Sequence, residues 1–291
     1  MTPQHKRTSI QRSAILGMAL LATGLCAATS HADEYTKSYT VSNRASVRVD
    51  TNDGSVNVTT GDTHQVEFRV EYQGYVLNKS LQIDSNQHGD EVELIARIPH
   101  GWHFSLGVMH RLHIEVRMPK EADLQVRTGD GSIKAENLSG NIDLHSGDGS
   151  LTVNSLKGTV RLHTGDGSIE GSDMDGKCNA VSGDGRIRLG GRFDALSAKS
   201  GDGSIGVEAT RGSKMDSEWR ISSGDGSIDV TLPADLPVDI DATTGDGHIS
   251  SDIPITMEGV ISKTRVHGKM NGGGATLTIH TGDGSIHLKR G

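Results

Sequence analysis

From Thr128 to its end, the chain repeats one pattern of hydrophobic and polar positions. Each copy has Thr or Ser, then Gly-Asp-Gly, one variable residue, an apolar residue and, two positions later, a mostly apolar or small residue. Successive copies start 18 residues apart four times, and then 23, 21 and 37 residues apart. Their first residues are Thr128, Ser146, Thr164, Ser182, Ser200, Ser223, Thr244 and Thr281. A fixed period is the signature of a repeat architecture, and the longer intervals indicate insertions on an unchanged unit.

Alternation within each copy predicts two short strands, each with one buried face. The inward columns are Ile133/Leu151/Ile169/Ile187/Ile205/Ile228/Ile249/Ile286, Ile142/Val160/Cys178/Leu196 and Leu144/Leu162/Ala180/Ala198. One turn falls at Gly-Asp-Gly and another near Gly140, Gly158 and Gly176. Stacking then places each strand about 4.8 Å from its copy. The sequence therefore predicts an all-β fold, a β-solenoid or β-helix with two short strands in each coil of about 18 residues.

A different pattern precedes this array. Longer strands are predicted at 65–72, 91–98 and 111–118, and Thr51-Asn52-Asp53-Gly54 resembles one more copy of the repeat. We expect residues 33–120 to form an N-terminal β region, with a first coil and capping strands, and residues 121–291 to form the solenoid array. A cap is physically required, because an exposed terminal coil offers an edge for aggregation.

The amino terminus is typical of a secretory signal peptide. Lys6, Arg7 and Arg12 precede an apolar run, and the small-x-small sequence Ser30-His31-Ala32 follows it. The run is shorter than the roughly 20 residues of a membrane span, although an uncleaved anchor is the alternative. We expect residues 1–32 to be removed and the protein to be exported to the periplasm, with the cell surface and the extracellular space as alternatives. No second apolar run approaches spanning length, so no membrane span is expected after cleavage.

Composition narrows the class of protein further. The chain of 291 residues has 38 Gly but only two Trp, four Tyr and three Phe, which indicates a thin repetitive structure rather than a thick core. The formal charge is −8, and loss of the three basic residues in 1–32 leaves 26 basic and 37 acidic residues, or −11. This acidic balance argues against nucleic acid as a partner. Cleavage also leaves Cys178 as the single cysteine, in an inward column where we expect a buried thiol.

The recurring Gly-Asp-Gly has two explanations. As a turn, it would use Gly for positive φ and Asp for hydrogen bonds to the backbone, with a ladder of Thr and Ser hydroxyls beside it. As a cation site, the stacked carboxylates would bind Ca²⁺, the one cofactor that the sequence suggests. That ladder would consist of Asp130, Asp148, Asp166, Asp184 and Asp202. The calcium β-roll repeat has a nine-residue period and a leading Gly pair, both absent here.

Histidine and aromatic residues gather in one short segment. His100, Trp102, His103 and Phe104 stand together in a chain that is poor in aromatics, and His110 follows. The segment is predicted to cap the solenoid, to bind a partner or ligand, or to bind a transition metal through its histidines. His145 and His163 lie one repeat apart in the same column, as a metal-binding pair or as surface residues beside a turn.

Two stretches carry a resemblance to a known family. Asp123-Leu-Gln-Val-Arg-Thr-Gly-Asp-Gly-Ser-Ile133 is followed by Leu138-Ser-Gly-Asn-Ile-Asp-Leu144, and the strand-Pro sequence Ile114-Glu-Val-Arg-Met-Pro-Lys120 precedes them. This array resembles the bacterial putative-adhesin family of unknown function, whose members carry strand–Gly–strand repeats after an export signal. The likeness covers most of residues 41–291. It implies a β-solenoid envelope or surface protein and supplies no catalytic motif.

Two classes of function remain. One is a non-enzymatic binding or scaffold module of the cell envelope, an adhesin for example, that binds an envelope or surface protein or a glycan. The other is a polysaccharide-active enzyme, a hydrolase or lyase, whose two carboxylates cannot be identified from so many Asp residues. Enzymes on repeat scaffolds break the repeat to build a site, which directs attention to the insertion Ile253–Ala275. The sequence favours the first class and gives no oligomeric state.

Overall fold

The computed structural model describes residues 32–99, 110–257 and 262–291. The chain divides into two compact units, residues 1–31 and 32–291, and all described residues belong to the second. Every regular element in these ranges is a β-strand, so the predicted all-β class is confirmed. Among the described residues there is no helix with the length and hydropathy of a membrane span.

Each repeat unit consists of a strand that leads into the Gly-Asp-Gly turn or its equivalent and a strand that leaves it. The leading strands are β2 (Ala45–Thr51), β6 (Glu91–Arg97), β8 (Ala122–Thr128), β10 (Ser139–Ser146), β12 (Lys157–Thr164), β16 (Trp219–Ser223), β18 (Val238–Thr244) and β22 (Thr276–Thr281). The trailing strands are β3 (Ser55–Gly61), β7 (Arg111–Pro119), β9 (Ile133–Glu136), β11 (Leu151–Asn154), β15 (Ile205–Ala209), β17 (Ile228–Leu232), β19 (Ile249–Ser251) and β23 (Ile286–Arg290). The two longest strands, β13 (Ile169–Ser182) and β14 (Ile187–Ser200), each trail in one unit and lead in the next.

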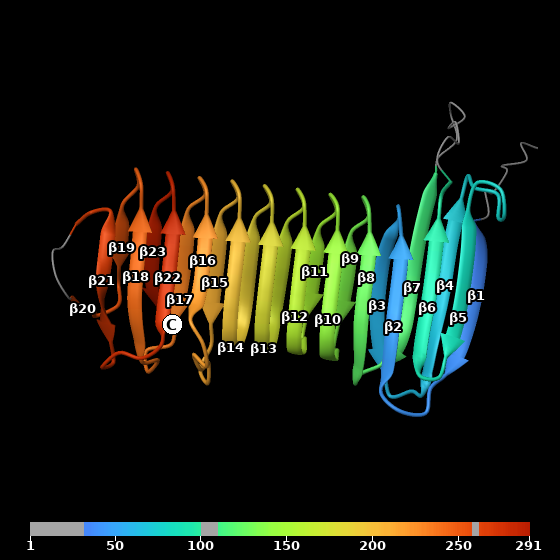
Figure 1. The fold of residues 1–291 in the computed structure, drawn as a ribbon, viewed down its shortest axis with the longest axis horizontal. Helices are drawn as coiled ribbons and strands as arrows, with labels where there is room; N and C mark the ends of the chain where they lie inside the picture. Colours follow the sequence, from blue (N-terminus) through green and yellow to red (C-terminus); the bar gives the residue numbers. More distant parts are fainter. Residues whose placement is uncertain (1–31, 100–109, 258–261) are drawn as a thin grey trace, which may run out of the picture. The chain divides into compact units, whose positions relative to one another are not determined.

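Successive units pair in parallel, leading strand with leading strand and trailing strand with trailing strand. Ile142 of β10 is in register with Val160 of β12, and Leu151 of β11 with Ile169 of β13, one 18-residue period apart. Repetition of this pairing joins the strands into one 23-stranded sheet with two rows (Figure 1). Parallel pairing of a strand with its own copy puts identical positions of all units into columns.

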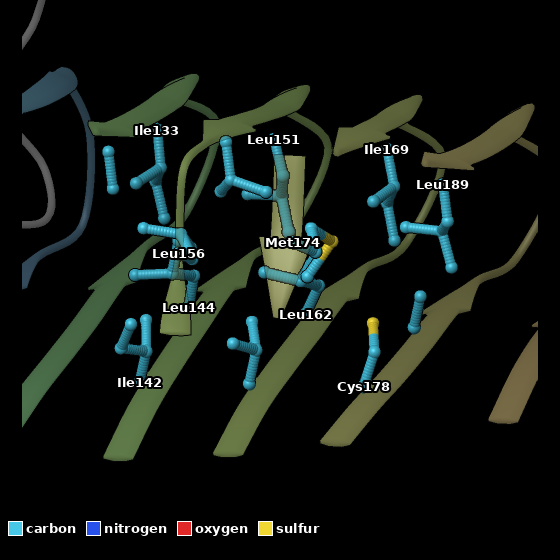
Figure 2. Packing of buried hydrophobic residues seen from close by; sticks show 14 of the residues in the cluster. Ile133, Ile142, Leu144, Leu151, Leu156, Leu162, Ile169, Met174, Cys178 and Leu189 are labelled. Carbon is cyan, nitrogen blue, oxygen red and sulfur yellow. The ribbon is translucent and has the colours of Figure 1, made fainter. Parts of the chain in front are cut away.

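The apolar columns point into the space between the two rows. Ile133, Leu151 and Ile169 extend from the trailing row toward Ile142 and Leu144 of the leading row, and all five are at most 1% exposed (Figure 2). Burial of these columns removes apolar surface from water in every unit, which is the main stabilising contribution to the fold.

Cys178 lies in one of these columns, in register with Val160 on one side and Leu196 on the other. It is 5% exposed and unpaired, and burial raises the pKa of its thiol to about 12. The predicted burial of this thiol is confirmed.

A third inward column was missed because it lies outside the two alternating segments. Leu138, Leu156 and Met174 are at most 3% exposed and fill the core at the turn opposite Gly-Asp-Gly. The residue before each of them has φ near +50°, in the left-handed region that Asn and Asp tolerate best. These residues are Asn137, Ser155 and Asp173.

The spatial order of the units differs from their order in the sequence at the carboxyl end. β22 pairs with β16 on one side and with β18 on the other, and β23 lies between β17 and β19 in the same way (Figure 1). The last unit of the chain is therefore inserted between the two units before it. The units that start at Thr244 and Thr281 are neighbours, so the long interval between them is an insertion, as predicted. The units that start at Ser223 and Thr244 are not neighbours, because the last unit lies between them.

The amino-terminal units are also out of sequence order. β2 lies between β6 and β8, and β3 lies between β7 and β9, so the unit formed by residues 91–119 is outside the one formed by 45–61. The predicted strands at 65–72, 91–98 and 111–118 correspond to β4 (Gln65–Gln73), β6 and β7.

Antiparallel strands cover both outermost units. β4 pairs with β7 and with β1 (Asp33–Thr40), while β5 (Gln82–His88) pairs with β6. The hydroxyls of Tyr35 and Tyr39 each lie 2.7 Å from Ser85 Oγ and link β1 to β5. At the other end β21 (Arg265–Met270) pairs with β18 and with the two-residue β20 (Thr256–Met257). The insertion Ile253–Ala275 therefore supplies edge strands in its described part.

The unusual order of the last units is tested by cross-linking. Ser222 of β16 is in register with His280 of β22, and Thr243 of β18 is in register with His280 from the other side. In a Cys178→Ala background we expect S222C/H280C and T243C/H280C to be joined by a short cross-linker with two thiol-reactive alkylating groups, because neighbouring strands lie about 5 Å apart. The pair S222C/T243C is separated by β22 and should stay unlinked by mass spectrometry. Efficient linkage of that pair would contradict the order.

Candidate functional site

The eight Gly-Asp-Gly turns, here called the corners, bring neighbouring backbones unusually close together. A Cβ atom on Gly147 would lie 2.6 Å from the carbonyl oxygen of Gly129, and one on Gly149 would lie 2.1 Å from that of Gly131. The same conflict recurs at all eight corners, where every such distance is at most 2.6 Å. None of these glycines has positive φ. The proposed need for positive φ is therefore wrong, and glycine is required because the preceding unit occupies the space of a side chain.

A ladder of buried hydroxyls runs beside the corners, as the turn explanation anticipated. Ser182 Oγ donates to the carbonyl of Gly167 in the preceding unit at 2.9 Å and accepts from the amide of Gly185 in its own corner at 2.9 Å. All eight Thr and Ser hydroxyls make the donor contact to the neighbouring unit, at 2.6–3.0 Å. These residues are at most 4% exposed. Each hydroxyl thus joins two units while it satisfies polar groups that burial would otherwise leave unpaired.

The aspartates of the corners point outward. Asp130, Asp148, Asp166, Asp184 and Asp202 are exposed and make no side-chain hydrogen bond or ion pair with other described residues. No group of three or more His, Cys, Asp or Glu side chains able to hold a metal occurs among the described residues. The structure places the carboxylates in one row along the corners, and calcium binding by that row stays a prediction.

The segment containing His100, Trp102, His103 and Phe104 lies outside the described residues. In the sequence it lies between β6, which ends at Arg97, and β7, which begins at Arg111. Asn52 fixes the chain before this segment, because its side-chain amide accepts from the Ile98 amide at 2.9 Å and donates to the Ile98 carbonyl at 2.8 Å. Asn52 occupies the position that the first glycine holds in the corners. The proposed capping, partner-binding and metal-binding roles stay predictions.

His145 and His163 lie side by side on the leading row. Their rings stack with centroids 4.7 Å apart and planes 6° apart, as expected for equivalent positions in adjacent units. Burial lowers the pKa of His145, and the neighbouring His163 lowers it further. His280 is in register with Ser222 on one neighbouring strand and with Thr243 on the other, so it does not stack with another histidine in its column.

The repeat is irregular where β13 meets β14. The register shifts there, and Arg192 forms ion pairs with the carboxylates of Asp175 and Asp194. The hydrogen bonds from Arg192 lower the pKa of Asp194. A glycosidase acid needs a carboxyl group with a raised pKa, and this environment has the opposite effect.

A shallow groove crosses the trailing row beside this irregularity. One hollow of about 410 Å³ lies over β13, β14, β15 and β17, and a second of about 490 Å³ adjoins it toward the opposite turn. Both are lined by Ser172, Gly190 and Glu208, so they form one continuous groove, here called the trailing-row groove. Sequence reasoning missed it. The sequence feature that could have revealed the groove is glycine at outward positions of β14 and β15, where the equivalent positions of other units carry side chains.

Comparison with known families now places the chain. The model of one family, Toastrack DUF4097, matches residues 28–289, which include every strand described above except the last residue of β23. The chain belongs to the Toastrack DUF4097 family. The match spans the irregular units at both ends as well as the regular corners, so these are parts of one Toastrack architecture.

The similar solved structures include proteins from Bacteroides and Parabacteroides. A putative adhesin from Bacteroides fragilis is 15% identical, with 88% of this Toastrack chain and 97% of that chain covered and a TM-score of 0.50. A putative lipid binding protein from Parabacteroides distasonis is 14% identical over 88% and 96%, with a TM-score of 0.47. A putative adhesin from Parabacteroides merdae is 11% identical over 88% and 95%, with a TM-score of 0.39. The likeness to the Bacteroides protein is one of fold alone. No curated protein matches the chain.

The close approach at the corners of this Toastrack chain predicts a sharp difference between two Gly→Ala variants. Gly149→Ala should lower the free energy of unfolding by about 1–3 kcal/mol or more, because its methyl group collides with a backbone carbonyl. Gly206→Ala is the matched control, since its methyl group would meet nothing nearer than the side chain of Arg188 at 3.8 Å. Urea unfolding should show the loss for Gly149→Ala only. Equal stability of the two variants would refute the account of the corners.

Proposed function

We propose that this protein is an exported, non-enzymatic β-solenoid that serves as a binding or scaffold module of the cell envelope. In this proposal residues 1–32 are a cleaved signal peptide, 33–120 form an N-terminal β region with capping strands, and 121–291 form the solenoid array. Antiparallel β1, β4 and β5 at one end, and β21 at the other, would prevent further strands from adding to the stack.

The observation that carries the proposal is the contrast between constant and variable columns. Most inward positions are apolar and the eight corners repeat Thr or Ser followed by Gly-Asp-Gly, because packing and the hydroxyl ladder demand it. One outward column of the trailing row, however, changes charge and size from unit to unit, as Lys134, Thr152, Glu170, Arg188, Gly206 and Asp229. A constant scaffold with a variable face is typical of repeat proteins that bind partners through an extended surface.

Two further facts support a binding role over catalysis. The Bacteroides fragilis structure with the same fold is that of a putative adhesin. In the described part of the chain, every carboxyl group whose pKa is clearly shifted has a lowered pKa, as at Asp90, Asp194 and Glu218. These groups are ionised at neutral pH and do not act as proton donors there.

Export and binding are tested together with the full chain carrying a carboxyl-terminal tag. We expect fractionation to recover the protein outside the cytoplasm, with mass spectrometry showing a chain that begins at Asp33. The recovered protein should sediment with isolated cell envelopes in a saturable manner. It should release no soluble sugar from them over several hours.

Three outcomes would contradict the proposal. A full-length chain in the cytoplasm would contradict export. Sedimentation that does not saturate with increasing protein concentration would contradict specific binding. Steady release of reducing sugar would favour the polysaccharide-active enzyme. Bovine serum albumin at the same concentration is the control for non-specific sedimentation.

A further inference from the structure

Two glycines of the trailing row have open space where a side chain would lie. Gly190 of β14 and Gly206 of β15 point outward, and neither has positive φ. A Cβ atom on Gly190 would meet nothing nearer than 3.9 Å, and one on Gly206 nothing nearer than 3.8 Å. The corner glycines, in contrast, leave no space for a side chain.

Glycine in the interior of a strand weakens it, since it has no side chain to pack and loses much conformational freedom. Such a glycine often marks a place where a ligand or another backbone approaches closely. Both strands are paired on both sides within the sheet, so no further backbone of this chain approaches them there. Gly190 lies opposite the bulge at which β13 shifts register, and glycine is common at bulges. Gly206 is in regular register with Arg188 and Asp229, so a ligand above the sheet is the remaining reason for its missing side chain.

The trailing-row groove lies where these side chains are absent. Both glycines line its hollow of about 410 Å³, and Gly190 also lines the adjoining hollow of about 490 Å³. Each volume lies within the range of about 300–1,000 Å³ that is usual for ligand sites. The lining contains no aromatic side chain, so hydrogen bonds rather than stacking must hold an occupant.

Charged groups of both signs surround the glycines and are free to bind. Glu170, Arg188 and Glu208 line the hollow and make no ion pair or hydrogen bond through their side chains with other described residues. Asp229, on the far wall, is already paired with Lys289 at 2.6 Å. The groove therefore offers two carboxylates as acceptors and one guanidinium as a donor.

We propose that the trailing-row groove binds an uncharged glycan chain. Hydroxyl groups donate to the two carboxylates and accept from Arg188, so a polyhydroxylated chain satisfies all three groups. A polyanion would face Glu170 and Glu208, and a polycation would face Arg188 and Lys289. An extended peptide is disfavoured, because the strands below have no unpaired edge for it to join. This inference rests on the proposed binding function and assigns its ligand class and its site.

The test fills the groove without disturbing the fold. In the full-length protein, Gly190→Thr and Gly206→Thr each place a β-branched side chain on the floor of the groove, and the double variant closes it. Because the space is open and threonine favours strands, the unfolding midpoint should stay the same or rise. Thr152→Val, an exposed position on the same row outside the groove, is the matched control.

Binding is measured by isothermal titration calorimetry with three defined hexasaccharides, composed of glucose, N-acetylglucosamine or galacturonate. We expect the wild-type protein and Thr152→Val to bind at least one of the two uncharged chains, with a Kd below about 1 mM. The double glycine variant should lose at least tenfold in affinity for it while its unfolding midpoint does not fall. Glu208→Gln should weaken the same binding.

Each other outcome overturns the inference. If neither uncharged chain binds, or if the double variant binds as well as wild type, the groove is not a glycan site. Exclusive binding of the galacturonate chain would also refute it. In each case saturable sedimentation with envelopes that survives in the double variant would leave the proposed function intact and place binding on another surface.

Discussion

A buried hydroxyl group at each corner is the interaction on which the rest of the structure depends. It donates to a carbonyl of the preceding unit and, at seven of the eight corners, accepts from an amide of its own. An unpaired polar group in this position would cost about 1–3 kcal/mol. The hydroxyl thereby fixes how closely two units approach, and that spacing requires glycine on both sides of the aspartate. The aspartate itself is left outside with no internal partner.

The same ladder explains why units can be stacked out of sequence order. Thr281 donates to Gly226 of one neighbour, and Thr244 donates to Gly284 of the other, with the geometry of consecutive units. Every corner presents the same donors and acceptors, so any unit fits beside any other. The path of the chain is then decided by its connections and by the antiparallel strands that finish each end. At the amino-terminal end the chain forms the outermost unit, β6 and β7, and then continues on the inner side of β2 and β3. At the other end it forms β18 and β19 first, and the last unit, β22 and β23, then lies between them and β16 and β17.

Much of the fold could be predicted from the sequence because it follows from alternation and a fixed period. Alternation and the fixed period were sufficient to predict the inward columns, including the position of Cys178. The cause of the corner glycines was assigned wrongly, because a single turn suggests local conformation whereas the constraint comes from the neighbouring unit. The place of the last unit could not be predicted, since its corner fits several slots equally well. Gly190 and Gly206 were visible as exceptions in their columns, but only the space around them shows that packing does not require them.

Amide hydrogen exchange at the corners tests the central claim most directly. The amides of Gly149, Gly185 and Gly203 donate to the buried hydroxyls at 2.9–3.0 Å. If these bonds hold the units together, the three amides should exchange as slowly as those of core residues such as Leu144 and Leu162, with opening only on global unfolding. Exchange at the rate of exposed turns, with the strands still protected, would show that the corners open independently and would contradict the account.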